Sequence, residues 1–454
     1  MKIHFIAIGG SAMHNLAIAL KLKNYEISGS DDEIFDPAKS RLKKYGILPE
    51  KIGWYPKKIT QDIDAIVLGM HAREDNPELV KAREMGIRIY SFPEFLYEQS
   101  KDKKRVVIGG SHGKTTITSM ILHVLNKLKK DFDFMVGAQL DGFEVMVKLS
   151  ETAPIIILEG DEYLTSPLDR RPKFWVYKPD IGVISGIAWD HFNVFQTFEI
   201  YKNQFLEFAN LIPESGRLIY CHEDANVVEV AKKFTCKNKT SYGIPKFEIN
   251  NGKSQILHSG ERFPISVFGK HNLMNIEAAR CVCNELGISD IEFYNAISSF
   301  EGASKRLEKL VHNDDFVAYK DFAHSPSKVE ATIKAVKEQY PQNKVVAVLE
   351  LHTYSSLNIN FLDQYQSTMD LADLPIVYFD NYALEIKKLP PLNIEMIKEK
   401  FNNEKIIVVN DKDSLKEVLL EQTYKNSSLI FMSSGNFGGL DLEGFVNEVV
   451  KEKS

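Results

Sequence analysis

The sequence has few cysteines, no excess of basic charge and no long apolar run. Its four cysteines form no C-x-x-C pair and lie beside no histidine cluster, which excludes a disulfide scaffold and a zinc site of that kind. The 56 basic residues against 62 acidic ones give a net charge of −6, which argues against a nucleic-acid-coating protein. No apolar run approaches the roughly 18 residues of a membrane span, and the first one is too short for a signal peptide. We therefore expect a cytoplasmic chain without membrane insertion.

The composition is that of a folded globular protein of several domains. Hydrophobic residues make up 44% and charged residues 26% of the 454 residues. At roughly 150 residues per domain, this length predicts about three domains. Strand-like apolar runs alternate with helical stretches throughout, which predicts an α/β fold. We place the domains at residues 1–100, 101–302 and 303–454, with the first and third Rossmann-like.

The clearest motif is G-S-H-G-K-T-T, which follows the strand-like run Val106–Ile108 and precedes a helical stretch. Backbone N–H groups of such a turn bind phosphate oxygens, the lysine reaches the terminal phosphates and the hydroxyl after it can coordinate Mg²⁺. The full pattern would have glycine where Ile108 stands, and an ordinary glycine-rich turn is the alternative. The candidate ATP-binding residues here are Gly110, Ser111, His112, Gly113, Lys114, Thr115 and Thr116.

Acidic residues follow the next two strand-like runs. Glu159-Gly160-Asp161-Glu162 comes directly after one run, and Asp190-His191 follows the other after a short turn. Ligands of α/β sheets bind at the carboxyl ends of the strands, so a carboxylate and a histidine there could hold a divalent metal against phosphates. Alone, such an acidic cluster is more often a charge at a helix N-terminus.

The N-terminal turn Gly9-Gly10-Ser11 also follows a strand-like run and opens a helical stretch, and Asp31 ends the next predicted strand. This arrangement is typical of nucleotide binding, with the helix N-terminus facing a pyrophosphate and the acid facing a ribose or base. Ala7 and Ala12 stand where glycines might be expected, so a plain α/β turn is an equal alternative.

Together these motifs resemble those of the Mur ligases, ATP-dependent enzymes that join amino acids or peptides to UDP-N-acetylmuramate. Besides the turn at Gly110 and the acids, the similar segments are G-K-H-N-L-M-N-I-E-A-A from Gly269, F-E-G-A-S-K-R-L-E from Phe300 and D-F-A-H-S-P from Asp321. The resemblance covers nearly the whole chain. It implies a UDP-sugar-binding first domain, a central ATPase domain with a P-loop and a C-terminal domain for the amino substrate.

The resemblance also implies cofactors and residue roles. ATP and Mg²⁺ would be required, with Lys114, Glu159 and His191 catalytic. Thr115, Glu159 and His191 would hold the metal. The remaining ATP contacts would be Asn272, Asn275, Arg306 and Asp321, and those to the UDP sugar Gly9, Gly10, Ser11, Asp31 and His71.

Two segments point to the amine that is joined. The opening G-G-S-A-M-H-N is similar to the branch acting directly on UDP-N-acetylmuramate, and D-E-Y-L-T-S-P-L-D-R-R-P-K-F from Asp161 resembles its peptide-joining members. This favours addition of the tripeptide L-Ala-γ-D-Glu-meso-diaminopimelate, a peptidoglycan recycling step. The alternatives are addition of L-alanine in de novo synthesis, a folylpolyglutamate synthase, and a P-loop ATPase or UDP-sugar sensor.

Some features depart from the family or stay open. The Y-x-x-x-K pattern of a carbamylated lysine is missing, since Phe205 follows Tyr201 at that spacing. His352, Tyr354 and Ser355 are candidate contacts to the amino substrate, or part of a structural loop. Arg170, Arg171 and Lys178 form a basic group that would lie near the lactyl carboxylate, or a solvated surface. We expect a monomer or weak homodimer.

Overall fold

The computed structural model describes residues 1–70, 72–140, 142–166, 169–189, 194–235, 237–250, 252–302, 307–313 and 315–451. The chain divides into two compact units. The first contains Met1–Ile244 and Met274–Ile297, and the second contains Pro245–Leu273 and Ser298–Ser454. Each unit is described by itself below.

The N-terminal part of the first unit is a four-stranded parallel sheet of order β2-β1-β3-β4. Its strands are β1 (Lys2–Ile6), β2 (Glu26–Ser30), β3 (Ala65–Leu68) and β4 (Ile89–Ser91). Its helices are α1 (Ser11–Leu22), α2 (Ala38–Lys44), η1 (Pro56–Lys58), α3 (Pro77–Glu84) and α4 (Phe92–Glu98). The strand order reverses between β1 and β3, and ligands of such sheets bind at the carboxyl ends of strands at that point. The turn after β1 therefore lies where a ligand is expected.

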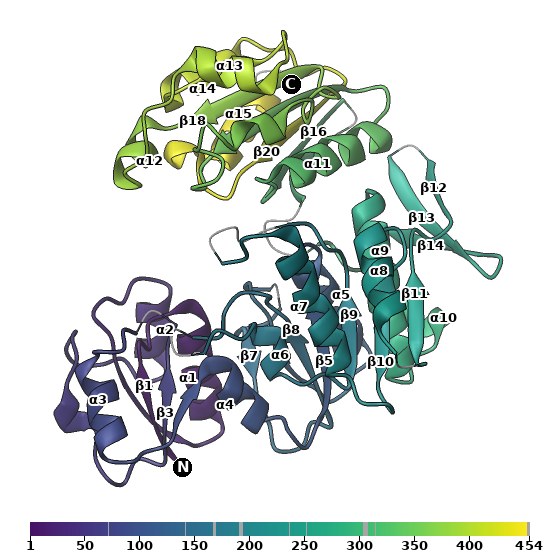
Figure 1. Cartoon of the computed structure of the whole chain (residues 1–454). Coiled ribbons are helices and arrows are strands. Elements are labelled where there is room, and N and C mark those ends of the chain that lie inside the picture. The colour runs from purple at the N-terminus through teal and green to yellow at the C-terminus, as the bar shows by residue number, and fades with distance from the viewer. Residues whose placement is uncertain are drawn as a thin grey trace. The chain divides into compact units, whose positions relative to one another are not determined.

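A seven-stranded sheet of order β11-β10-β9-β5-β8-β6-β7 forms the rest of the first unit (Figure 1). Its strands are β5 (Lys104–Gly109), β6 (Asp133–Met135), β7 (Val147–Lys148), β8 (Ile155–Glu159), β9 (Ile181–Ile184), β10 (Arg217–Cys221) and β11 (Lys239–Tyr242). Its helices are α5 (Lys114–Lys127), α6 (Lys173–Val176), α7 (Phe198–Asn210), α8 (Ala225–Lys233) and α10 (Asp290–Ile297). Strand β7 is antiparallel to β6, whereas the other pairings are parallel. The central strands are buried, as their continuous apolar sequences predict.

The second unit contains a three-stranded antiparallel sheet and a six-stranded sheet of order β15-β16-β20-β17-β18-β19. The small sheet consists of β12 (Phe247–Asn250), β13 (Lys253–His258) and β14 (Glu261–Ile265). The large one consists of β15 (Glu308–His312), β16 (Phe316–Asp321), β17 (Lys344–Leu351), β18 (Leu374–Phe379), β19 (Ile407–Val409) and β20 (Ser427–Met432). Its helices are α11 (Pro326–Gln339), η2 (Leu362–Tyr365), α12 (Asn381–Ile386), α13 (Ile394–Phe401), α14 (Lys412–Leu420), η3 (Phe437–Gly439) and α15 (Leu442–Lys451). Helix α9 (Lys270–Glu285) begins in this unit and ends in the first.

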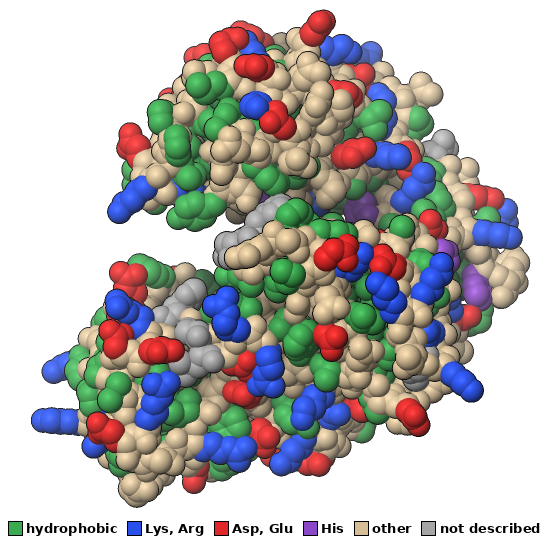
Figure 2. Space-filling view, in the orientation of Figure 1, with side chains coloured by type: hydrophobic (Ala, Val, Ile, Leu, Met, Phe, Trp, Pro, Cys, Tyr) green, Lys and Arg blue, Asp and Glu red, His purple; other side chains and the backbone are tan. Residues whose placement is uncertain are grey.

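The architecture confirms the predicted α/β class with parallel sheets. The sequence predicts five strands in the third region, and the structure adds the antiparallel edge strand β15, which is half exposed and therefore lacks a continuous apolar run. The boundaries near residues 100 and 302 stay predictions. Among the described residues, none of the helices has the length and apolar character needed to cross a membrane. On the face in Figure 2, acidic and basic side chains are interspersed.

Candidate functional site

The turn between β5 and α5 has a backbone conformation that requires glycine at two positions. Gly110 has a φ of +135° and Gly113 a φ of +81°, a region that side chains other than glycine rarely adopt. A β-carbon on Gly110 would collide with the Ser185 hydroxyl, and one on Gly113 would lie 2.6 Å from Asn275 Oδ1. The two glycines of the motif therefore let the chain turn tightly against β9 and α9.

The N-terminus of α5 carries the features of an anion site. The helix follows Gly113, which makes no side-chain cap, and its first turn contains no acidic residue. The first backbone N–H groups of a helix lack intrahelical partners, and the helix dipole favours negative charge there. Ser111, Lys114, Thr115 and the buried Thr116 surround this end of the helix. The geometry suits a bound phosphate group.

Lys114 is held by an ion pair inside the turn. Its Nζ lies 2.6 Å from Glu162 Oε2 and donates to the Gly110 carbonyl oxygen at 2.6 Å. The Glu162 side chain is 1% exposed and that of Lys114 16%. Burial alone would lower the pKa of Lys114, but the charges of Glu162 and Asp161 outweigh it, so the pKa is raised. Lys114 is therefore a fixed cation at the helix N-terminus.

Tyr201 connects Glu162 back to the turn. Its hydroxyl donates to Glu162 Oε1 at 3.1 Å and lies 2.8 Å from Ser111 Oγ. The Ser111 hydroxyl in turn accepts the Ala188 N–H at 2.9 Å. A continuous arc of hydrogen bonds therefore runs around the turn, from Lys114 through Glu162 and Tyr201 to Ser111.

Thr115 and Glu159 supply oxygen atoms beside this arc. The Thr115 hydroxyl donates to Glu159 Oε1 at 2.9 Å, and the Gly137 N–H donates to Oε2 at 2.8 Å. Burial raises the pKa of Glu159, although both hydrogen bonds and Lys114 oppose the rise. Hydroxyl and carboxylate oxygens are the ligands that Mg²⁺ prefers, so this pair fits the predicted metal. The neighbouring Asp161 accepts from Lys173 at 2.6 Å.

Of the other residues predicted to bind ATP or metal, some lie at the turn and others lie outside the described residues. Asn275 lies against Gly113, and the His112 ring lies against Gly186, which follows β9. Asn272, one turn before Asn275 in α9, donates to the Phe268 carbonyl oxygen at 2.9 Å. His191 and Arg306 lie outside the described residues, as does Asp190. Within the described part of the chain, no group of three His, Cys, Asp or Glu side chains could hold a metal ion.

The predicted UDP-sugar turn brings Gly9 and Asp31 together. The Gly9 N–H donates to Asp31 Oδ2 at 2.6 Å, and a β-carbon on Gly9 would lie 2.9 Å from that oxygen. Burial raises the pKa of Asp31 to about 6. Gly10 precedes α1 and the exposed Ser11 begins it, while His71 lies outside the described residues. Ala7 has a φ of +68°, which explains why glycine is expected at this position.

In the second unit, the predicted residues lie at the carboxyl ends of strands. Asp321 ends β16, is buried and accepts from the Thr332 hydroxyl at 2.8 Å. His352 follows β17, with Nδ1 3.7 Å from Glu350 Oε1. Tyr354 is 64% exposed and Ser355 is also exposed. Their exposure suits contact with a substrate.

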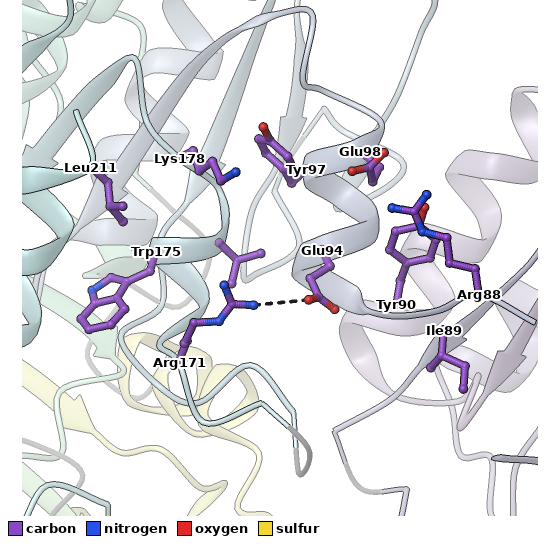
Figure 3. A pocket seen from close by; sticks show the side chains of 11 residues that line it. Arg88, Ile89, Tyr90, Glu94, Tyr97, Glu98, Arg171, Trp175, Lys178 and Leu211 are labelled. Carbon is purple, nitrogen blue, oxygen red and sulfur yellow. Dashed lines mark hydrogen bonds and ion pairs between the residues drawn. The ribbon is translucent and has the colours of Figure 1, made fainter. Parts of the chain in front are cut away.

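Two of the three basic residues expected near the lactyl carboxylate, Arg171 and Lys178, contact other side chains. Arg171 pairs with Asp169 at 2.6 Å and with Glu94 of α4 at 3.3 Å, as Figure 3 shows for Glu94. The Lys178 Nζ lies 4.7 Å from the centre of the Tyr97 ring. Both residues line a cavity of about 360 Å³ (Figure 3). Arg171 and Lys178 therefore stabilise the contact between α4 and the segment before β9.

The sequence pattern does not identify two residues of the site. Glu162 belongs to the acidic cluster after β8, and Tyr201 begins a Y-x-x-x-K pattern that fails. The signal for Glu162 is its position directly after Asp161 at the carboxyl end of β8. Tyr201 lies on a distant helix, and no local signal connects it with the turn.

Comparisons with known proteins agree with this geometry. Residues 108–283 match the family described as Mur ligase middle domain, and residues 2–104 match Mur ligase family, catalytic domain. A UDP-N-acetylmuramate–L-alanine ligase of Clostridium botulinum is 31% identical over 450 residues, covering 96% of this chain and 95% of the relative.

Solved structures share the fold. A UDP-N-acetylmuramate–alanine ligase of Thermotoga maritima has a TM-score of 0.70 and 20% identity, covering 100% of this chain and 99% of the other. A murein peptide ligase of Psychrobacter arcticus has a TM-score of 0.63 and 20% identity, covering 99% of this chain and 98% of the other.

Proposed function

The chain belongs to the Mur ligase family, and from this we propose that it joins an amine to the lactyl carboxylate of UDP-N-acetylmuramate. It is an ATP-dependent, ADP-forming ligase of peptidoglycan synthesis. The observation that carries the proposed chemistry is the fixed Lys114 cation beside the Thr115 and Glu159 oxygens at the N-terminus of α5. In this proposal residues 1–100 bind the UDP sugar, residues 101–302 bind ATP and residues 303–454 bind the amine.

The reaction requires activation of a carboxylate, which is a poor acyl donor. Its oxygen attacks the γ-phosphorus of ATP, ADP leaves, and an acyl phosphate forms. The amine nitrogen then attacks the acyl carbon, loses a proton, and expels inorganic phosphate to give the amide. Lys114 and the N–H groups of the Gly110–Thr116 turn would stabilise charge on the transferring phosphoryl group.

The proposed remaining roles follow from position. Thr115, Glu159 and His191 would hold Mg²⁺, which neutralises phosphate charge when bound. The further contacts to ATP would come from Asn272, Asn275, Arg306 and Asp321. The UDP sugar would lie at Gly9, Gly10, Ser11, Asp31 and His71, and the amine at His352, Tyr354 and Ser355.

L-Alanine is the first candidate for the amine. The Clostridium botulinum relative, named for L-alanine, is 31% identical and covers almost the whole chain. This support is stronger than that for the tripeptide, which the sequence motifs favour.

The tripeptide remains the second candidate because of the segment between β8 and α6. Its described residues fold back on themselves: the Thr165 N–H donates to the Arg171 carbonyl oxygen at 2.9 Å, and Lys173 pairs with Asp161. This segment carries the sequence that resembles peptide-joining members of the family. The Psychrobacter arcticus murein peptide ligase supports a shared fold only.

The test offers L-alanine or the tripeptide in parallel, with ATP, Mg²⁺ and UDP-N-acetylmuramate. Phosphate release and the mass of the product are both measured. A product with L-alanine at far higher kcat/KM supports the first candidate, whereas the reverse result supports the second. Phosphate release that is equal without the UDP sugar and the amine would contradict both and indicate a simple ATPase.

A further inference from the structure

We infer that Asn15 is a positioning residue. It couples the predicted UDP-sugar turn at Gly9–Ser11 to Glu159, the carboxylate beside the predicted ATP turn. This inference rests on the proposed function, because it assigns the two sites as proposed above. Asn15 lies on α1, one turn after Ser11, and its side chain is completely buried. A buried amide must satisfy its polar atoms internally, so its partners are fixed.

The Asn15 amide joins two segments that are distant in the sequence. Its Nδ2 donates to the Ser11 carbonyl oxygen at 2.8 Å, and its Oδ1 accepts the Met146 N–H at 3.0 Å. The Nδ2 also lies 3.4 Å from Met146 Sδ. Reversing the amide would set its NH₂ group against the Met146 N–H, so the contacts define one orientation. Asn15 therefore fixes the first turn of α1 against Met146.

Met146 in turn is tied to the ATP site. Its carbonyl oxygen accepts the Val136 N–H at 3.0 Å, where β6 and β7 separate. The next residue, Gly137, donates its N–H to Glu159 Oε2. A β-carbon on Gly137 would lie 2.7 Å from Glu159 Oε1, so backbone and carboxylate are in close contact. A shift of Met146 is thereby passed to Glu159 and to its partner Thr115.

The packing around this path favours transmission over local adjustment. Strand β7 lies against α1 within the first unit (Figure 1). Asn15, Met146 and Val136 are buried, and such close-packed groups cannot relax independently. The path then ends at the more exposed hydrogen bond between the Gly137 N–H and Glu159. A UDP sugar that fixes Gly10 and Ser11 would therefore also restrict Glu159. The consequence is that each ligand should change the affinity for the other by the same factor.

The segment just before β7, which contains Met146, makes a second set of contacts, and these offer a matched control. The Glu144 side chain accepts from the Tyr45 hydroxyl at 2.8 Å and pairs with Lys44, both belonging to the α2 region. The Lys44 and Glu144 side chains are exposed and do not lie on the path through Met146. Removing Glu144 weakens the contact of this segment with α2 and leaves the Asn15 hydrogen bonds in place.

The experiment measures the affinity of the full-length protein for Mg²⁺ and the non-hydrolysable ATP analogue AMP-PNP, with and without saturating UDP-N-acetylmuramate. The wild type is expected to show a coupling factor of about fivefold or more. In Asn15→Leu and Asn15→Ala the factor should fall below about twofold, while each ligand alone binds within about threefold of wild type. Glu144→Ala should keep the wild-type factor.

Three results would overturn the inference. These are coupling that survives both Asn15 substitutions, equal loss of coupling in Glu144→Ala, and collapse of both separate affinities in the Asn15 variants, which indicates a purely structural role. Thermal unfolding of each variant accompanies the titrations. A wild-type protein that binds AMP-PNP but no UDP-N-acetylmuramate would instead refute the proposed function, so the two failures are distinguishable.

Discussion

Lys114 Nζ lies 2.6 Å from Glu162 Oε2, so a carboxylate is paired with the cation that the family resemblance assigns to the ATP phosphates. The pair is largely buried, and Tyr201 fixes the second carboxylate oxygen. A buried lysine without a counter-charge would tend to lose its proton. Glu162 therefore keeps Lys114 charged before the nucleotide arrives, at the expense of competing with the phosphate for it.

Replacing Glu162 with Gln tests this competition. Glutamine keeps the size and the contact with Tyr201 but removes the negative charge, so phosphate no longer has to displace a carboxylate from Lys114. We expect ADP to bind about fivefold more tightly without Mg²⁺, which corresponds to about 1 kcal/mol. Isothermal titration calorimetry of both proteins checks this. Unchanged or weaker binding of ADP to the variant would show that Glu162 does not compete with phosphate.

Replacing Lys114 with Ala should remove turnover while sparing the other nucleotide site. The cation that stabilises the transferring phosphoryl group is lost, so kcat should fall by about 100-fold or more. The proposed site of UDP-N-acetylmuramate is the separate turn around Gly9, so the dissociation constant of this ligand should change by less than about threefold. Phosphate release and calorimetry give the two values.

Lys127→Ala, at the C-terminal end of the same helix, is the control for Lys114→Ala. It should leave both the turnover and the affinity for the UDP sugar near those of the wild type. Loss of UDP-sugar binding in Lys114→Ala, with the control intact, would contradict the separation of the two sites.

Local sequence predicted the elements of the site better than its contacts. The run Val106–Ile108 followed by the motif at Gly110 predicted the strand, turn and helix, because buried parallel strands are apolar throughout and glycine permits the turn. Gly9 and Asp31 were expected to follow two successive strands, and these strands pair in parallel, which brings the two residues together. These features depend on residues within one βα or βαβ unit.

Contacts made across the fold were not predictable in the same way. Tyr201 reaches Glu162 from α7, and Asn15 reaches Met146 across more than a hundred residues. Neither residue has a periodicity or a neighbour that signals its partner. Conversely, Arg171 and Lys178 are conspicuous as charges, yet they contact Glu94 and the Tyr97 ring. Which partner a side chain finds depends on tertiary packing rather than on local pattern.

Asp31 should make the stability of the protein depend on pH. Burial raises its pKa from 3.8 to about 6, so its favourable contribution is fully present below pH 3.8 and is lost as the pH rises through about 6. Asp31→Asn cannot ionise. Its free energy of unfolding relative to wild type should therefore increase between pH 4 and pH 7.5, by at most about 3 kcal/mol. Urea unfolding at both pH values measures the difference, and a constant or decreasing difference would show that the Asp31 pKa is not raised.

Glu350 should position the amine-binding loop, since its buried carboxylate joins two segments at the carboxyl edge of the second unit's large sheet. Glu350 accepts the Phe437 N–H at 2.9 Å and the Ser433 hydroxyl, and its other oxygen faces His352. Glutamine in its place keeps the size and one acceptor but removes the charge beside His352. With His352 as a proposed amine contact, we expect KM for the amine to rise roughly three- to tenfold while KM for UDP-N-acetylmuramate stays unchanged, because a displaced contact weakens only the ligand it touches.

Steady-state kinetics with each substrate varied in turn separates the two constants. Glu395→Gln is the matched control, because it makes the same change at a side chain that is 82% exposed on α13. A parallel rise in both KM values for Glu350→Gln would mean that Glu350 affects both substrate sites, which would contradict a role confined to the amine. A rise for the amine alone, absent from the control, would place the amine at the carboxyl end of β17, since a general loss of stability would lower the amount of active enzyme and leave both KM values unaltered.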